Sequence, residues 1–273
     1  MDRVEGLNPR GSGAAIAPAA PSPYEAPELY DMLFESLAFD RAFWLEVGRQ
    51  AGGPVLDLAC GTGRVLIPLL EAGVDADGVD LFPAMLERLR EKAAAKGFRP
   101  RLEAADMRDF TMPRRYARVI CTFNAFAHCD TIEEQLATLR CCREHLDPGG
   151  ALVLHMSYPG ATLWTGVDGE PVLEHEATHP ANGHRLQLYD RRFTDAVNQS
   201  QRSEMEVREV GARGNVVAAH RFTSRQRWVY RYEMELLLGL AGFARFEIHG
   251  DFAGGPLERD DQQMIAWAWR EPA

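Results

Sequence analysis

The sequence predicts an α/β protein built on a central, mostly parallel sheet. Between residues 54 and 156, short apolar runs alternate with segments that have helical spacing. Single helices between strands imply parallel pairing through right-handed crossovers, hence a doubly wound sheet. A glycine-containing turn, Cys60-Gly61-Thr62-Gly63, follows the first apolar run, and ligands of such sheets bind beyond the carboxyl ends of the strands.

The N-terminal part divides into two segments. Residues 1–23 are rich in Ala, Pro, Gly and Ser, and such a composition buries too little apolar surface to offset the entropy of ordering, so we expect a disordered tail. From residue 24 to residue 50, apolar residues such as Leu29, Leu33 and Val47 recur at helical spacing, which predicts lid helices that pack on the following domain.

The remaining elements follow in order along one domain, residues 24–273. Strands are predicted at 54–58, 76–79, 101–104, 119–122, 151–156, 245–248 and 264–269. Helices are predicted at 64–72, 84–96, 131–145 and 232–241. Thr131 and Glu134 have capping-box spacing at the start of the third of these helices. Residues 157–230 alternate polar and apolar side chains, with turn signals at Asn182-Gly183, so we expect an antiparallel β insertion that forms a lid over the site.

Composition restricts the class of ligand. The formal net charge of −10 disfavours a nucleic-acid binder, because phosphate binding requires clustered Lys and Arg, and a small molecule is the expected partner. No apolar run reaches the ~20 residues of a membrane span, so we expect a cytoplasmic protein. The oligomeric state, monomer or homodimer, does not follow from the sequence. The five cysteines are expected to be reduced, and no ligand spacing predicts a metal site.

The turn after the first strand carries the chemistry. Gly61 and Gly63 allow the backbone to approach a ligand closely, and the helix that follows offers unpaired N–H groups. A dinucleotide fingerprint would place a third glycine at position 66, which is Leu66. Asp57 would repel a pyrophosphate but could meet an ammonium group. Asp80, at the end of the second strand, is placed to accept hydrogen bonds from ribose hydroxyls.

From about Tyr24 to Trp269 the chain resembles the class I S-adenosylmethionine-dependent methyltransferases. The resemblance implies a Rossmann-like sheet of seven strands with the last one antiparallel, and S-adenosyl-L-methionine as cofactor, converted to S-adenosyl-L-homocysteine. The motif that binds the methionine moiety and ribose in this family matches Asp57, Gly61 and Gly63, with Ala59 in place of a familiar glycine. Asp106, after the third strand, corresponds to the acidic residue that reaches the adenine amino group.

The predicted site residues fall into three groups. The expected cofactor-binding residues are Tyr30, Asp57, Ala59, Cys60, Gly61, Thr62, Gly63, Arg64, Asp80, Leu81, Phe82, Met85, Asp106, Met107, Arg108, Phe123 and Asn124. The expected acceptor-site residues are His128, His155, Tyr158, Arg227 and Tyr230. His128 is the candidate general base, and Tyr24 is a candidate to close the site. Arginines of the insertion could form an anion clamp or simply a solvated sheet face; they are Arg191, Arg192, Arg225, Arg227 and Arg231.

The expected reaction is methyl transfer to a small-molecule acceptor, with N- or O-methylation favoured. A non-catalytic protein that binds the same cofactor stays open as an alternative. An NAD-dependent oxidoreductase is a weaker alternative, because it needs a glycine at position 66 and a Tyr-x-x-x-Lys or comparable proton donor, and neither is present. The acceptor atom does not follow from these residues.

Overall fold

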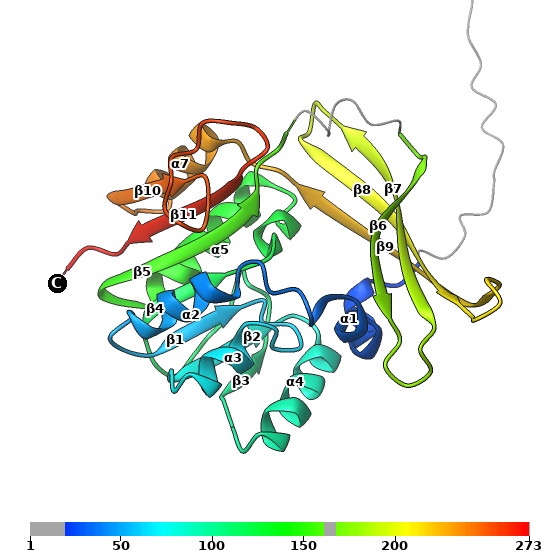
Figure 1. The fold of residues 1–273 in the computed structure, drawn as a ribbon. Coiled ribbons are helices and arrows are strands. Elements are labelled where there is room, and N and C mark those ends of the chain that lie inside the picture. The colour runs from blue at the N-terminus through cyan, green and yellow to red at the C-terminus, as the bar shows by residue number, and fades with distance from the viewer. Residues whose placement is uncertain (1–19, 161–167, 273) are drawn as a thin grey trace, which may run out of the picture.

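The computed structural model describes residues 20–160 and 168–272 (Figure 1). Most of the predicted tail, residues 1–19, lies outside the described residues. The last part of that segment is placed: Ser22 caps a short 3-10 helix, η1 (Pro23–Glu25), by accepting a hydrogen bond from the Tyr24 amide. In the described part of the chain, no helix is both long enough and apolar enough to cross a membrane.

The central sheet has seven strands, as the resemblance implies. Their order is β10 (Arg245–His249), β11 (Gln263–Trp269), β5 (Leu146–Ser157), β4 (Tyr116–Cys121), β1 (Val55–Leu58), β2 (Ala76–Asp80) and β3 (Leu102–Ala104). Strands β1 to β5 pair in parallel, whereas β11 runs antiparallel to both β5 and β10. The predicted doubly wound sheet with an antiparallel last strand is confirmed.

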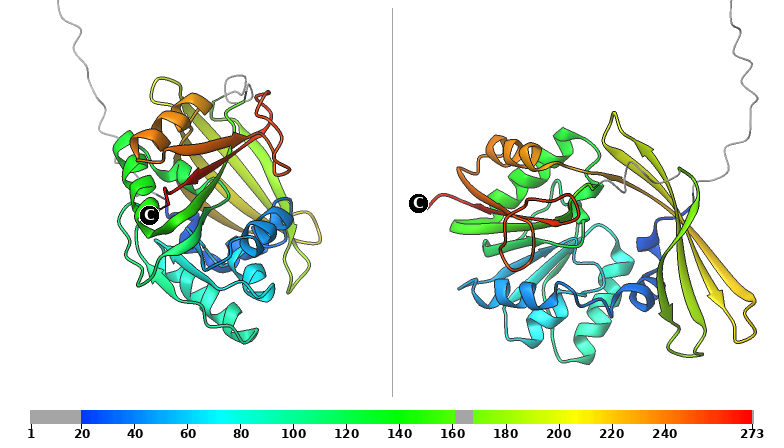
Figure 2. Two further views of the ribbon diagram at one scale, coloured as in Figure 1. Left: turned by 90° about the vertical axis from the view of Figure 1, so that its left-hand side faces the viewer. Right: turned by 45° about the horizontal axis from the view of Figure 1, so that its top comes forward.

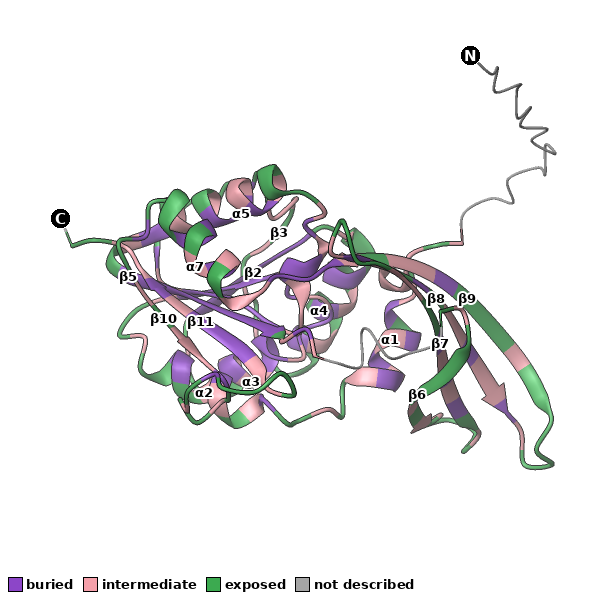
Figure 3. Cartoon of the chain, turned by 90° about the horizontal axis from the view of Figure 1, so that it is seen from above, coloured by how far each residue is buried: buried purple, intermediate pink, exposed green. Residues whose placement is uncertain are grey.

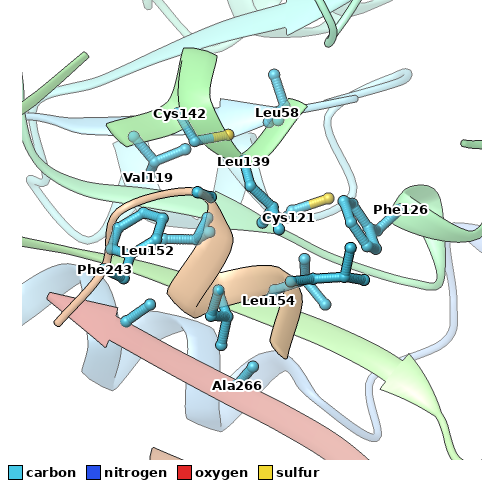
Figure 4. Close-up of a cluster of buried hydrophobic side chains, with 14 of the residues drawn as sticks. Leu58, Val119, Cys121, Phe126, Leu139, Cys142, Leu152, Leu154, Phe243 and Ala266 are labelled. Carbon is cyan, nitrogen blue, oxygen red and sulfur yellow. The ribbon is translucent and has the colours of Figure 1, made fainter. Parts of the chain in front are cut away.

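Helices cover both faces of this sheet because successive strand residues point to opposite sides. On one face, Val55 and Ile120 pack under α2 (Arg41–Arg49), α3 (Leu66–Glu71) and α4 (Pro83–Ala95). On the other face, Leu58, Val119 and Leu152 pack under α5 (Ile132–His145) and α7 (Arg231–Leu240), as Figure 4 shows. Buried residues accordingly concentrate along these strands in Figure 3.

The start of α5 follows the predicted cap with one change. Thr131 Oγ1 accepts a hydrogen bond from the Glu134 amide at 3.2 Å, as a capping box requires. The Glu134 carboxylate, however, accepts from the amide of Asp130 at 2.7 Å rather than from that of Thr131. The reciprocal bond is therefore displaced by one residue, and it fixes the loop that precedes α5.

The predicted antiparallel insertion is confirmed as a second, four-stranded sheet. It consists of β6 (Pro171–Thr178), β7 (Arg185–Asp195), β8 (Ser200–Val210) and β9 (Val216–Arg227), in that order. Helix α1 (Pro27–Phe34) lies between this sheet and the central domain (Figures 1 and 2). Its Leu29 and Leu33 pack on the insertion in one hydrophobic cluster, and its buried Asp31 binds Arg88 and Lys92 of α4 at 2.9 Å each.

Candidate active site

A cavity of about 350 Å³ opens at the carboxyl ends of the parallel strands. The loops after β1, β2, β3 and β4 form its floor, and residues of η1, α1 and β9 complete its wall. Of the predicted cofactor-binding residues, all except Asp57, Gly63 and Asn124 line this cavity. Both candidate catalytic residues, Tyr24 and His128, line it as well.

The loop after β1 is a run of tight left-handed turns. Ala59 has a φ of 57° and Gly63 a φ of 90°, a region that residues with a Cβ rarely adopt. A Cβ on Gly63 would lie 2.3 Å from Leu89 Cδ1, so this glycine lets the loop pack on α4 rather than facing the cavity. Ala59 carries the strain that a glycine at the same position would avoid.

Asp80 is held rigidly at the end of β2. Its Oδ2 accepts a hydrogen bond from the Gly61 amide at 2.8 Å, and its Oδ1 accepts from the Phe82 amide at 2.9 Å. Burial raises the pKa of this carboxyl group, and the two amides partly oppose that change. Each carboxylate oxygen can accept more than one hydrogen bond, so Asp80 remains able to bind further donors in the cavity.

Asp57 lies next to the glycine loop and is 1% exposed. Within the described ranges its Oδ1 has no hydrogen-bond partner, and burial raises the pKa of this carboxyl group to about 8 against the opposing charge of Arg64. Arg64 instead forms a two-point ion pair with Asp40, at 2.6 and 2.8 Å, and lies 4.7 Å from the Phe123 ring centre. Among the residues placed by the structure, no basic side chain forms an ion pair with Asp57.

Asp106 and Arg108 form a pair in the cavity wall. The Arg108 amide and Nε donate to Asp106 Oδ1 at 2.9 and 2.8 Å, and these bonds hold the pKa of Asp106 below its usual range despite partial burial. Arg108 also binds Glu134 of α5. Sequence reasoning predicted both residues at the site, and their pairing is a property that the structure adds.

Tyr24 and His128 are joined by a hydrogen bond of 2.7 Å between the phenolic oxygen and Nε2. His128 Nδ1 lies 3.1 Å from the carbonyl oxygen of Arg225. Because a carbonyl only accepts, Nδ1 carries the proton and Nε2 accepts from the Tyr24 hydroxyl. Burial lowers the pKa of His128 and raises that of Tyr24, which favours a neutral imidazole and a neutral phenol.

Seven of the predicted site residues lie outside the cavity lining: Asp57, Gly63, Asn124, His155, Tyr158, Arg227 and Tyr230. His155 is buried and its Nε2 bonds to Gln263 Oε1 at 2.8 Å. The rings of Tyr158 and Tyr230 pack against each other, 6.0 Å between centres. Asn124 bonds to Ser157 through its side-chain amide and carbonyl, at 3.2 and 2.5 Å. These side chains make internal contacts near the carboxyl edge of the sheet.

The anion clamp considered as one possibility for the arginines of the insertion does not assemble at the cavity. Arg227 is buried, and it binds Glu233 at 2.6 Å and Gln135 at 3.0 Å, so it ties the insertion to α7 and α5. Arg192 pairs with Glu174 on the insertion. Of the five arginines considered, Arg225 alone lines the cavity, where its main chain also holds His128.

Sequence reasoning missed part of the wall contributed by Ser22, Thr223 and Ser224. Ser22 fell in the predicted tail, yet this segment is fixed to β9. The Thr223 amide donates to the Pro21 carbonyl at 3.1 Å, and its hydroxyl donates to the Ala20 carbonyl at 2.9 Å. Contacts between segments so far apart in the chain leave no local signal in the sequence.

Comparison with known proteins points to one family. A family model described as a methyltransferase domain matches residues 55–150. The chain is 28% identical over 252 residues to a cypemycin N-terminal methyltransferase from Streptomyces sp., covering 90% of this chain and 96% of that protein. It is 34% identical over 100 residues to a dTDP-3-amino-3,4,6-trideoxy-α-D-glucopyranose N,N-dimethyltransferase from Streptomyces venezuelae, covering 37% of this chain and 40% of that protein.

The fold agrees with these sequence matches. An S-adenosylmethionine-dependent methyltransferase from Clostridium acetobutylicum superposes with a TM-score of 0.72 at 16% identity, covering 89% of this chain and 97% of that one. The glycine loop, the acidic residue that ends β2 and the strand order occur here together. The chain therefore carries a methyltransferase domain at residues 55–150, on the fold of the S-adenosylmethionine-dependent methyltransferases, and is an enzyme that transfers methyl groups from S-adenosylmethionine.

Proposed function

We propose that this enzyme transfers a methyl group to the nitrogen of a small amine, with S-adenosylmethionine in the cavity described above. The observation that carries the proposal is the cavity itself, because it joins the glycine loop and Asp80 to a wall formed by η1, α1 and β9. The two relatives compared above are, by name, an N-terminal methyltransferase and an amino-sugar N,N-dimethyltransferase, which favours nitrogen as the acceptor atom.

The residues of the cavity fit the cofactor. The free lone pairs of Asp80 suit the ribose hydroxyls. Asp57 does not line the cavity but is buried beside the glycine loop, and its unpartnered Oδ1 suits the ammonium group of the methionine moiety. Phe82 and Met85 offer apolar surfaces to the adenine, and Asp106 offers a hydrogen-bond acceptor for its amino group. When bound, S-adenosylmethionine supplies a methyl group activated by a positively charged sulfur.

The protein mainly holds the cofactor and the acceptor in position and excludes water. These two effects suffice for much of the acceleration of an in-line displacement. Tyr24 covers the cavity from η1, with its ring 5.9 Å from Tyr30 and 5.4 Å from Phe82. The attacking nitrogen must lose a proton during the reaction. Tyr24 Oη takes that proton as its own hydroxyl proton passes to His128 Nε2, so His128 acts through Tyr24.

Titration with S-adenosylhomocysteine, with NAD in parallel, tests the cofactor site. Asp80→Asn should weaken binding of the homocysteine analogue by ~10-fold or more, because the amide no longer accepts charge-assisted hydrogen bonds. Asp75→Asn is the matched control, since Asp75 precedes the same strand at its other end and pairs with Arg114. Absence of binding, or binding of NAD alone, contradicts the proposal.

A further inference from the structure

The face of the four-stranded sheet that packs against α1, here called the inner face, carries two buried polar atoms without partners. Among the residues that the structure describes, His175 Nε2 on β6 and Asp190 Oδ1 on β7 have no hydrogen bond. Buried side-chain polar atoms are hydrogen-bonded in the large majority of cases, because an unmade bond leaves the cost of removing the atom from water uncompensated. Two such atoms on neighbouring strands suggest groups reserved for a ligand.

Strand register places both side chains on the inner face. His175 lies directly opposite Leu188, and Asp190 follows Leu188 by two positions on the same strand, so the two are diagonal neighbours on one face. Leu188 packs against α1, and the His175 ring is stacked on Phe34 of α1 with 5.9 Å between centres. Ser203 of β8 joins the pair by donating its hydroxyl hydrogen to Asp190 Oδ2 at 3.0 Å.

His175, Asp190 and Ser203 do not themselves line the cofactor cavity, but neighbouring residues link them to its lining in two places. Ser203 lies directly opposite Ser224 of β9, and Ser224 lines the cavity. On the other side, Phe34 separates His175 from Phe123, which lies 6.0 Å from the Phe34 ring centre and also lines the cavity. Phe123 follows β4, so the group is connected through Phe34 to a loop of the central domain.

The charges select among acceptors. Asp190 is 7% exposed and binds Arg192 at 2.9 Å, and Arg192 is shared with Glu174 at 2.9 Å. Two carboxylates and one guanidinium leave a net charge of −1, which repels a carboxylate on the acceptor and favours an ammonium or hydroxyl donor. The free Asp190 oxygen accepts such donors, and the free His175 nitrogen can accept or donate.

We propose that His175, Asp190 and Ser203 form the acceptor subsite, and that the acceptor is a hydroxylated amine without a carboxylate, such as an amino sugar. The subsite holds the hydroxyl or amino donors of the acceptor on the inner face, so that the nitrogen to be methylated projects between Tyr30 and Phe123. This inference rests on the proposed amine methyltransferase function and gives its acceptor a chemical class.

The test uses the full chain and three probes: a dTDP-linked amino sugar, glycine and an unblocked dipeptide. Methylation is followed by mass spectrometry, and S-adenosylhomocysteine affinity by calorimetry. We expect the amino sugar to be the preferred substrate. Asp190→Asn and His175→Asn should each raise its KM by ~10-fold or more, with kcat changed less than about threefold and S-adenosylhomocysteine affinity unchanged. The second variant retains an amide near the Nδ1 position and removes the Nε2 atom.

Glu204→Gln is the matched control, because Glu204 follows Ser203 on β8, lies on the opposite face of the sheet and pairs with Arg202. The kinetics of this variant should equal those of the wild type. Preference for glycine or the dipeptide, methylation of none of the probes, or an unchanged KM in both subsite variants overturns the assignment. If the wild type does not bind S-adenosylhomocysteine, the proposed function itself is contradicted. Failure of the acceptor subsite and failure of the proposed function are therefore distinguishable.

Discussion

Asp57→Asn should stabilise the cofactor-free enzyme while weakening its cofactor site. Burial raises the pKa of Asp57 from an ordinary 3.8 to about 8. At pH 7 the folded chain therefore keeps a proton that the unfolded chain has released, and keeping it costs ~1.4 kcal/mol for each pH unit above the unfolded value, roughly 4 kcal/mol in all. An amide avoids this cost but leaves N–H groups in need of acceptors, at ~1–2 kcal/mol. The free energy of unfolding of the variant should therefore be higher by about 2 kcal/mol.

The sign of the pH dependence gives the sharper test. A raised carboxyl pKa means that Asp57 lowers stability progressively as pH rises from about 4 to about 8, and the asparagine variant lacks that slope. Urea unfolding at pH 6 and pH 7.5 should show the stability difference between the two proteins growing by about 2 kcal/mol. S-adenosylhomocysteine should bind the variant ~10-fold more weakly or worse. A difference that stays constant with pH would refute the reasoning.

Two further predictions concern the loop after β1 and the closing tyrosine. Ala59→Gly should raise the free energy of unfolding by up to about 1 kcal/mol, because the left-handed φ of 57° strains alanine. Ala94→Gly, at an exposed position in the last turn of α4, should lower the free energy of unfolding by up to about 1 kcal/mol. A lower free energy of unfolding in both variants would contradict the strain argument. Tyr24→Phe keeps the ring but removes the hydrogen bond to His128. The kcat with the preferred amine should therefore fall ~10- to 100-fold, while the affinity for S-adenosylhomocysteine should not change. An unchanged kcat would exclude the proton path through Tyr24.

Local patterns in the sequence were sufficient to predict most of the fold. Pro83 opens α4 and Thr131 caps α5 as predicted, because capping depends on residues close together in the chain. Alternating side chains predicted the insertion, and its strands pair as consecutive hairpins. The turn at Gly61 and the carboxylate of Asp80 also meet as expected, since the ends of neighbouring parallel strands lie side by side.

The tertiary structure decided what each polar side chain binds. Arg227 and His155 were predicted at the acceptor site, yet Arg227 is bound by Glu233 and His155 by Gln263. His175 carries no signal in the sequence, although its ring stacks on Phe34 of α1 and its buried Nε2 has no hydrogen-bond partner among the described residues. Sequence determined the elements and the cofactor loop because those depend on neighbours in the chain. The cavity wall and the proposed acceptor subsite depend on segments that meet only after α1 packs between the two sheets. This packing alone fixes which buried polar atoms find hydrogen-bond partners.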